Sequence, residues 1–293
     1  MKRNSFLSAL ALTACALPLS ATVAPVDSFN VVWDSPSTNH HGSMPLGNSD
    51  IALNAWMTKD GDLQFYISKT DAWDDNARLL KIGKVRVHFE PNAITAGKPF
   101  RQELNLSEGC VEIRTGGVLE TRIRLWVDAN HPVIHVTAES ATPLEAIASV
   151  ELWRTNQQEL AELQTSDVLL NRKLPNKKQA TMIVEPDTML TNQRGRIGWF
   201  HHNIKSVGPQ LLAELQGLTG IKQADPLLHR TFGAVITAAG GERLDDLHLR
   251  SPRGKAHRFN VFVLTRHPST PERWLADMDE TIRQVEALDS AAN

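Results

Sequence analysis

The stretch ETRIRLWVD, residues 120–128, alternates polar and apolar side chains along most of its length. Successive side chains of a β-strand point to opposite faces of the sheet. One face of this stretch therefore carries Ile123, Leu125 and Val127, and the other carries two arginines and Trp126. The pattern predicts a strand with one face in a hydrophobic core and the other in water or against a partner.

Runs of the same kind recur between residues 62 and 140. They are DLQFYIS (62–68), KVRVHFE (84–90), CVEIRT (110–115) and PVIHVTAES (132–140). Turn sequences such as KDGD (59–62) separate them and supply the Gly and Asp of tight hairpins. Short strands at this spacing favour a sandwich over alternating strand and helix units. We expect a mainly β fold, a large two-sheet antiparallel β-sandwich over residues 27–267, with short helices in segments 155–171 and 209–218.

The last segment, residues 268–293, has a helical pattern instead. One stripe of this predicted helix is apolar and consists of Trp274, Met278, Ile282 and Val285. Ser269 and Glu272 stand at the spacing of a capping box, and Pro271 suits the first turn. We expect an amphipathic linker helix that buries its stripe either on the sandwich or against a further domain.

The first 24 residues read as a secretory signal peptide. Lys2 and Arg3 precede an apolar run from Phe6 to Leu19, which is shorter than a membrane span of about 20 residues. The sequence LTAC (12–15) resembles a lipoprotein box, in which Cys15 would be acylated; conventional cleavage near residues 21–24 is the alternative. We expect an exported protein, periplasmic or associated with the outer membrane of a bacterium, with membrane contact only through such a lipid anchor.

The charge balance of the chain limits its partners. Without Lys2 and Arg3 it has 31 − 2 = 29 Lys and Arg residues against 33 Asp and Glu residues, a net charge of −4. No run of basic residues offers the concentrated positive face that nucleic acid requires, so we expect no nucleic-acid partner. Outside the signal segment Cys110 is the only cysteine, which excludes an internal disulfide.

Several motifs together resemble a known family. In chain order they are WDSP (33–36), GSMPLGNSDIALNAW (42–56), DGDLQFYISKTDAWDD (60–75), RLLKIGKVRVHFEP (78–91), PFRQELNL (99–106), LWVDANHPVIHV (125–136), GWFHHN (198–203) and HRTFGAVI (229–236). This order resembles the domain of unknown function 5703, which is similar to the N-terminal sandwich of glycoside hydrolase family 95. One departure is Ser49, because the family loop usually reads Gly-Asn-Gly and a side chain restricts the backbone there.

The resemblance implies a large antiparallel sandwich that precedes an (α/α)6 barrel in family members, where the barrel holds the glycosidase active site. It implies that this chain lacks the barrel and is non-catalytic. Carbohydrate is then the expected partner, through the barrel. We expect no cofactor, and we identify no catalytic residue.

A few residues are candidates for a carbohydrate-binding or barrel-facing role. They are Asn48, Asp71, Trp73, Trp199 and His201. Tryptophan rings suit the apolar faces of sugars, although packing in the core is their other use. Asp71 could equally hold backbone amides in a turn. The pairs His40-His41 and His201-His202 diverge if they lie on strands, and no ligand spacing completes a zinc pattern, so we expect no metal.

Two hypotheses follow. The first is the non-catalytic N-terminal sandwich of an exported glycoside hydrolase; the second is a stand-alone periplasmic carbohydrate-binding or scaffold protein. The second predicts that the apolar stripe at Trp274 is buried on the chain's own sandwich, whereas an exposed stripe favours the first.

Overall fold

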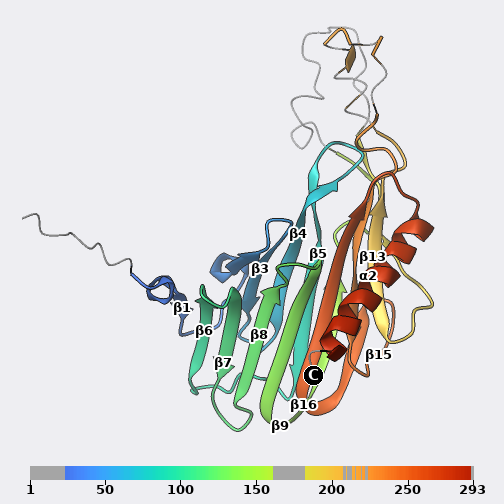
Figure 1. Cartoon of the computed structure of the whole chain (residues 1–293). Coiled ribbons are helices and arrows are strands. Elements are labelled where there is room, and N and C mark those ends of the chain that lie inside the picture. The colour runs from blue at the N-terminus through green and yellow to red at the C-terminus, as the bar shows by residue number, and fades with distance from the viewer. Residues whose placement is uncertain are drawn as a thin grey trace, which may run out of the picture.

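The computed structural model describes residues 24–160, 182–206 and 224–291, together with single positions between 209 and 221. Within these residues, one 14-stranded antiparallel sheet makes up most of the fold (Figure 1). Its strands are β1 (Val31–Trp33), β2 (Met44–Gly47), β3 (Ile51–Met57), β4 (Leu63–Trp73), β5 (Leu79–Glu90), β6 (Phe100–Asn105), β7 (Cys110–Thr115), β8 (Thr121–Val127), β9 (Val133–Glu151), β12 (Thr188–Met189), β13 (Arg196–His202), β14 (Thr231–Ala238), β15 (Glu242–Arg243) and β16 (His248–Arg266). The prediction of a mainly β fold is confirmed.

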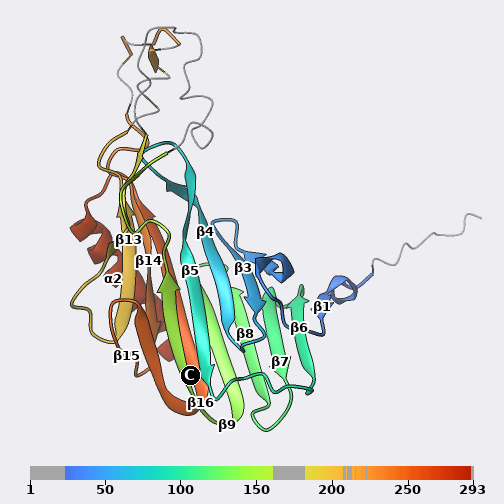
Figure 2. The ribbon, with the colours of Figure 1, turned by 180° about the vertical axis from the view of Figure 1, so that it is seen from behind.

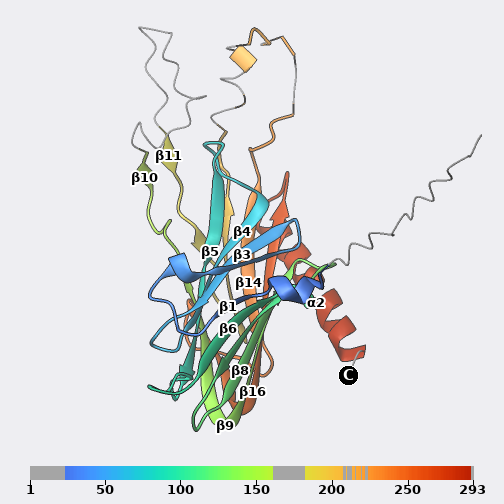
Figure 3. The ribbon, with the colours of Figure 1, turned by 90° about the vertical axis from the view of Figure 1, so that its left-hand side faces the viewer.

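Two strands of 19 residues each, β9 and β16, connect the two layers of the sheet. They pair with each other from Val133↔Phe262 to Ser149↔His248. The other edge of β9 pairs with β8 through residues 134–140 and with β5 through residues 145–151. The sheet divides there, so that β2 to β5 form one layer and the remaining strands the other (Figure 3). The predicted antiparallel sandwich is therefore present, with its layers joined as one curled sheet.

The core lies between these layers and follows the alternation read from the sequence. Ile123 and Leu125 of β8 are fully buried, whereas Arg122 is exposed. They belong to one cluster with inward residues of the other layer, such as Phe65 of β4 and Val85 of β5. Burial of these apolar faces is the main stabilising contribution to a sandwich of this kind.

The C-terminal helix α2 (Pro271–Ala291) lies along the outer face of β13, β14 and β16 (Figure 1). All four residues of the predicted stripe are buried there: Trp274, Met278, Ile282 and Val285. The helix is capped by Thr270 rather than Ser269, since Thr270 Oγ1 accepts the backbone N–H of Arg273 at 3.3 Å. Pro271 occupies the first helical position, which moves the cap to the residue before it.

Of the two predicted internal helices, the first falls largely outside the described residues and the second is described in part. Of segment 155–171, Gln158–Glu159 form strand β10, which pairs with β11 (Ile183–Val184), and residues 161–171 are outside. In segment 209–218, positions 209, 213 and 214 are helical as predicted, and residues 210–212 and 215 are outside the described residues. Of the predicted signal residues 1–24, only residue 24 is described. Two short 3-10 helices, η1 (Val26–Phe29) and η2 (His40–Gly42), precede β1 and β2. In the described ranges, no helix combines the length and apolar character needed to cross a membrane.

Candidate functional site

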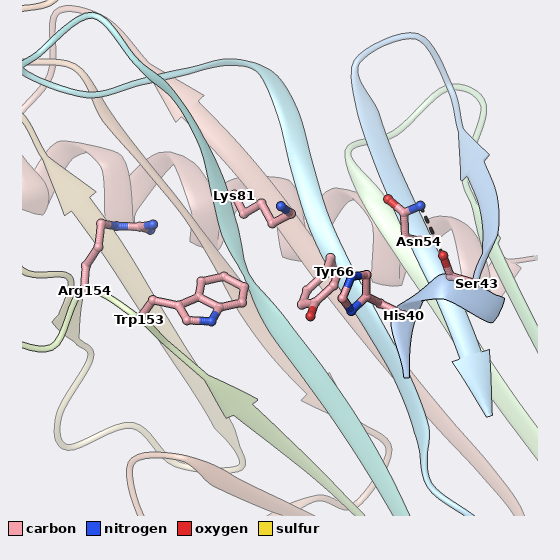
Figure 4. A pocket seen from close by; sticks show the side chains of 7 residues that line it. All are labelled: His40, Ser43, Asn54, Tyr66, Lys81, Trp153 and Arg154. Carbon is pink, nitrogen blue, oxygen red and sulfur yellow. Dashed lines mark hydrogen bonds between the residues drawn. The ribbon is translucent and has the colours of Figure 1, made fainter. Parts of the chain in front are cut away.

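Strands β3, β4 and β5 lie on the side of the sandwich away from α2 (Figure 2). Their outer face carries an open pocket. Alternation along β4 buries Phe65 and Ile67 in the core and leaves Tyr66 on this outer face, where it pairs in register with Asn54 of β3. The pocket has a volume of about 520 Å³. Figure 4 shows its lining residues, which are His40, Ser43, Asn54, Tyr66, Lys81, Trp153 and Arg154.

Aromatic rings form a row across the floor of this pocket. The ring centroids of Trp153 and Tyr66 are 5.7 Å apart, and those of Tyr66 and His40 are 5.9 Å apart. Buried Trp56 supports Tyr66 at 5.2 Å. Trp153 is 50% exposed, although aromatic side chains of this size usually bury most of their surface. The row therefore offers an accessible apolar ring face to a ligand.

Polar groups border the row. The Lys81 ammonium nitrogen lies 5.3 Å from the centroid of the Tyr66 ring in its middle, a cation–π distance. Near the His40 end (Figure 4), Asn54 Nδ2 donates to Ser43 Oγ over 3.4 Å. Apolar ring faces next to a few fixed polar groups are typical of small-molecule sites.

Arg154 connects the pocket with a buried polar cluster. Its Nε donates to Asp187 Oδ1 at 2.8 Å, and the same oxygen lies 3.1 Å from Nδ1 of His201. The side chains of Asp187 and His201 are each only 1% exposed. This buried support fixes the position of the Arg154 guanidinium at the edge of the pocket.

The β4–β5 connection brings a second buried carboxyl group to the same end of the sandwich. Asp75 Oδ1 accepts the backbone N–H of Lys205 at 3.0 Å, whereas Oδ2 is buried without a partner among the described residues. Burial raises the pKa of Asp75 to about 6, against the opposing effects of the Lys205 N–H and of nearby His201. Part of the Asp75 population is therefore protonated near neutral pH.

Two of the sequence-predicted residues, Asn48 and Asp71, line a different open pocket of about 570 Å³. Asn48 Nδ2 donates to the backbone carbonyl of Asp128 at 2.8 Å, and its Oδ1 accepts the N–H groups of Asp50 and Ile51. Asp71 accepts a 2.8 Å hydrogen bond from Lys69 Nζ. Burial opposes ionisation of Asp71, but hydrogen bonds from Lys69 and Thr265 and the positive charges of Lys69 and Arg230 together outweigh it, so the pKa of Asp71 is lowered. Both side chains thus form hydrogen bonds with other groups of the same chain.

The other three predicted residues do not join one site. Trp73 is exposed, and its Nε1 donates to the carbonyl of Thr70 at 3.1 Å. Trp199 is 1% exposed in the core, where its Nε1 donates to the carbonyl of Ile82 at 2.8 Å. Its ring is covered by the sandwich and is not accessible to a ligand. His201 reaches the pocket only indirectly, through Asp187 and Arg154.

Sequence reasoning missed Tyr66, Lys81 and Trp153. The alternation of DLQFYIS places Tyr66 on the outer face, and this signal was available. Trp153 carried no comparable signal, because its position depends on the pairing of β9 with β5, such as Lys84↔Glu151. The register of strands distant in sequence decides which side chains meet.

The two histidine pairs behave differently. His201 and His202 diverge on β13 as expected, since His202 Nδ1 faces Thr231 Oγ1 at 2.7 Å while His201 is buried. His40 and His41 instead lie in the 3-10 helix η2 with ring centroids 4.4 Å apart, so the divergence expected on a strand does not apply to this pair. Across the described parts of the chain, no group of three or more His, Cys, Asp or Glu side chains is arranged to hold a metal ion.

Comparison with known proteins adds a family and a distant structural likeness. No curated protein matches the sequence. A solved structure described as "Putative kojibiose phosphorylase from human microbiome" is similar with a TM-score of 0.44 and 9% sequence identity, over 91% of this chain and 36% of that chain. The family model of the domain of unknown function DUF5703 matches residues 32–293. The chain therefore belongs to the DUF5703 family.

Proposed function

We propose that the chain is a non-catalytic, carbohydrate-binding β-sandwich domain of an exported glycoside-hydrolase-like protein. The observation that carries the proposal is the row of Trp153, Tyr66 and His40 in an open pocket on the outer face. Sugar rings have apolar faces that suit an aromatic platform, and their hydroxyl groups need hydrogen-bond partners at its edge. Asn54, Ser43 and Arg154 are such partners.

A binding role fits this pocket better than hydrolysis. Glycoside hydrolysis normally needs two carboxyl groups at a set separation. No Asp or Glu is among the described residues that line the pocket. The resemblance found in the sequence assigns catalysis to an (α/α)6 barrel, so we assign no catalytic group to residues 27–267.

Binding can be measured by isothermal titration calorimetry against soluble xyloglucan, β-1,4-galactan, polygalacturonate and chondroitin sulfate. The test variant is Trp153→Ala in the pocket. Its matched control is Trp33→Ala, because Trp33 is also an exposed tryptophan but lies on β1, outside the pocket. We expect Trp153→Ala to weaken binding of the recognised glycan about tenfold, since an aromatic contact contributes roughly 1.4 kcal/mol beyond its area. Equal losses in both variants would contradict the proposed site.

The non-catalytic part of the proposal has its own test. Hydrolysis of aryl glycosides by this chain alone should not exceed the rate of a heat-denatured sample. Activity above that rate, and its loss in Asp71→Asn, would overturn the proposal, because Asp71 is a carboxylate beside an open pocket.

The stand-alone binding protein remains the second candidate. Its prediction of a buried apolar stripe agrees with the position of Trp274 and Met278 on the chain's own sheet. A linker helix followed by a barrel can pack in the same way, so burial of the stripe does not exclude the first candidate. Export is part of both proposals. Mass spectrometry of the mature N-terminus distinguishes acylated Cys15 from cleavage near residues 21–24.

A further inference from the structure

The pocket is basic, although the chain as a whole is acidic. The sequence has a formal net charge of −2 with histidine counted as neutral, but the charged residues that line the pocket are Lys81 and Arg154, and no carboxylate is among the lining residues. A concave site with charges of one sign raises the local concentration of ligands of the opposite sign. The charge of the lining is therefore a clue to the class of sugar.

Lys81 differs from the other cations that project from β5. Lys84 forms an ion pair with Glu151, and Arg86 pairs with both Glu151 and Asp62. For Lys81, no carboxylate partner exists among the described residues; its ammonium group instead lies over the Tyr66 ring. A cation held against a ring, without a counter-charge, remains available to an anionic ligand.

Arg154 provides a second fixed cation. Its Nε donates to Asp187 Oδ1 at 2.8 Å, and the described residues engage no other of the five N–H donors that a guanidinium group presents in a rigid fork. In the view of Figure 4, the Trp153 ring lies between the Arg154 guanidinium on one side and Lys81 with Tyr66 on the other. The arrangement places a cation on either side of the exposed Trp153 side chain.

We infer that the pocket binds an acidic sugar residue, whose ring stacks on Trp153 while its carboxylate or sulfate group lies between Lys81 and Arg154. The inference rests on the proposed carbohydrate-binding function and specifies its ligand class. Ionised acceptors form shorter and stronger hydrogen bonds with Lys and Arg than neutral hydroxyl groups do. A neutral sugar would offer Lys81 no counter-charge.

The experiment compares three probes of equal length: an oligogalacturonate, which is carboxylated; a chondroitin sulfate oligosaccharide, which also carries sulfate; and a neutral galacto-oligosaccharide. Calorimetry is carried out with the wild type, Lys81→Gln and Lys81→Arg. Lys98→Gln is the charge-matched control, because Lys98 is exposed and lies in the β5–β6 connection outside the pocket. Arg154 is not substituted, since its loss would leave buried Asp187 without this partner.

We expect at least one acidic probe to bind more tightly than the neutral probe. Lys81→Gln should weaken that binding about tenfold, Lys81→Arg should restore most of it, and Lys98→Gln should leave it unchanged. Preference for oligogalacturonate would identify the carboxylate as the recognised group, and preference for chondroitin sulfate the sulfate. Equal or tighter binding of the neutral probe, lost in Trp153→Ala, would overturn the inference and leave the proposed function standing. If no glycan of either class binds, both fail.

Discussion

The two outer faces of the sandwich both carry aromatic side chains, but only one of them is covered. Trp274 of α2 is 0% exposed, because the helix packs on Phe200, Phe262 and neighbouring residues of one layer. Trp153, beside the other layer, is 50% exposed in an open pocket. The same type of side chain thus contributes to folding on one face and remains accessible on the other.

This difference separates structural from ligand-binding use of apolar surface. Where the fold needs burial, the chain supplies its own amphipathic helix. On the face with Tyr66 and Trp153 it supplies no cover within the described residues, and the row is bordered by cations and hydrogen-bonding groups instead. An exposed aromatic row in such surroundings fits binding better than packing.

The largest expected change in stability comes from a substitution on the covered face. Trp274→Ala should lower the free energy of unfolding by about 3–5 kcal/mol, because it removes a large buried side chain and leaves a cavity under α2. Trp153→Ala should change it by less than about 0.5 kcal/mol, as is usual for exposed positions. Guanidinium denaturation followed by far-UV circular dichroism measures both. Similar losses in the two variants would show that the two faces do not differ as described.

The next effect concerns the polar end of the sandwich, where Asp75 is buried with an unpaired oxygen. Its folded pKa of about 6 lies above the ordinary value of about 3.9, so the folded state binds a proton that the unfolded state releases between these values. This contribution to stability is present below pH 4 and is lost as the pH rises to 6. Asp75→Asn should therefore stabilise the protein by roughly 2–3 kcal/mol at pH 7.5 and by almost nothing at pH 4.

Urea denaturation of Asp75→Asn and wild type across pH 4–8 tests this dependence. A variant that is less stable at pH 7.5 would mean that the Asp75 carboxylate is ionised and paired. The Asp75 carboxylate would then have its partner within the chain, just as the apolar surface under α2 is covered by the chain itself.

The smallest effect concerns the turn between β2 and β3, next to Asn48. Ser49 has a φ of +76°, the left-handed region that costs an ordinary residue about 1–2 kcal/mol. Ser49→Gly should relieve this strain and, after the entropy cost of glycine, stabilise the protein by about 0.5 kcal/mol. Ser49→Val should destabilise it by roughly 1–2 kcal/mol, because a β-branched residue fits this region poorly. Thermal denaturation measures both, and equal melting temperatures for the two variants would contradict the assigned strain.

Much of the fold could be predicted from sequence, because alternation along strands is a local signal. Ile123 and Leu125 are buried as their positions require, and the stripe of α2 faces the sheet. The position of Ser49 also agrees with a loop in which the family uses glycine, since its backbone adopts the conformation that glycine favours. Local patterns and backbone geometry were sufficient for these features.

The candidate site could not be predicted in the same way. Trp199 and Trp153 are the same residue type, yet one is in the core and the other in the pocket. The pocket joins η2, β3, β4, β5 and the segment after β9, so its composition depends on how distant strands pair. The spacing of residues in the sequence does not reveal that register, which explains why Tyr66, Lys81 and Trp153 were not predicted as site residues.

The pairing of β9 with β16 also constrains the order in which the protein can fold. Residues 133–151 are synthesised well before residues 248–266, and β9 exposes a long unpaired edge until β16 arrives. Contacts between segments so distant in sequence make folding slow, and open strand edges invite aggregation. A chain that ends before His248 would lack the strand that connects β9 to β14, so the sandwich can close only after its last strand has been made.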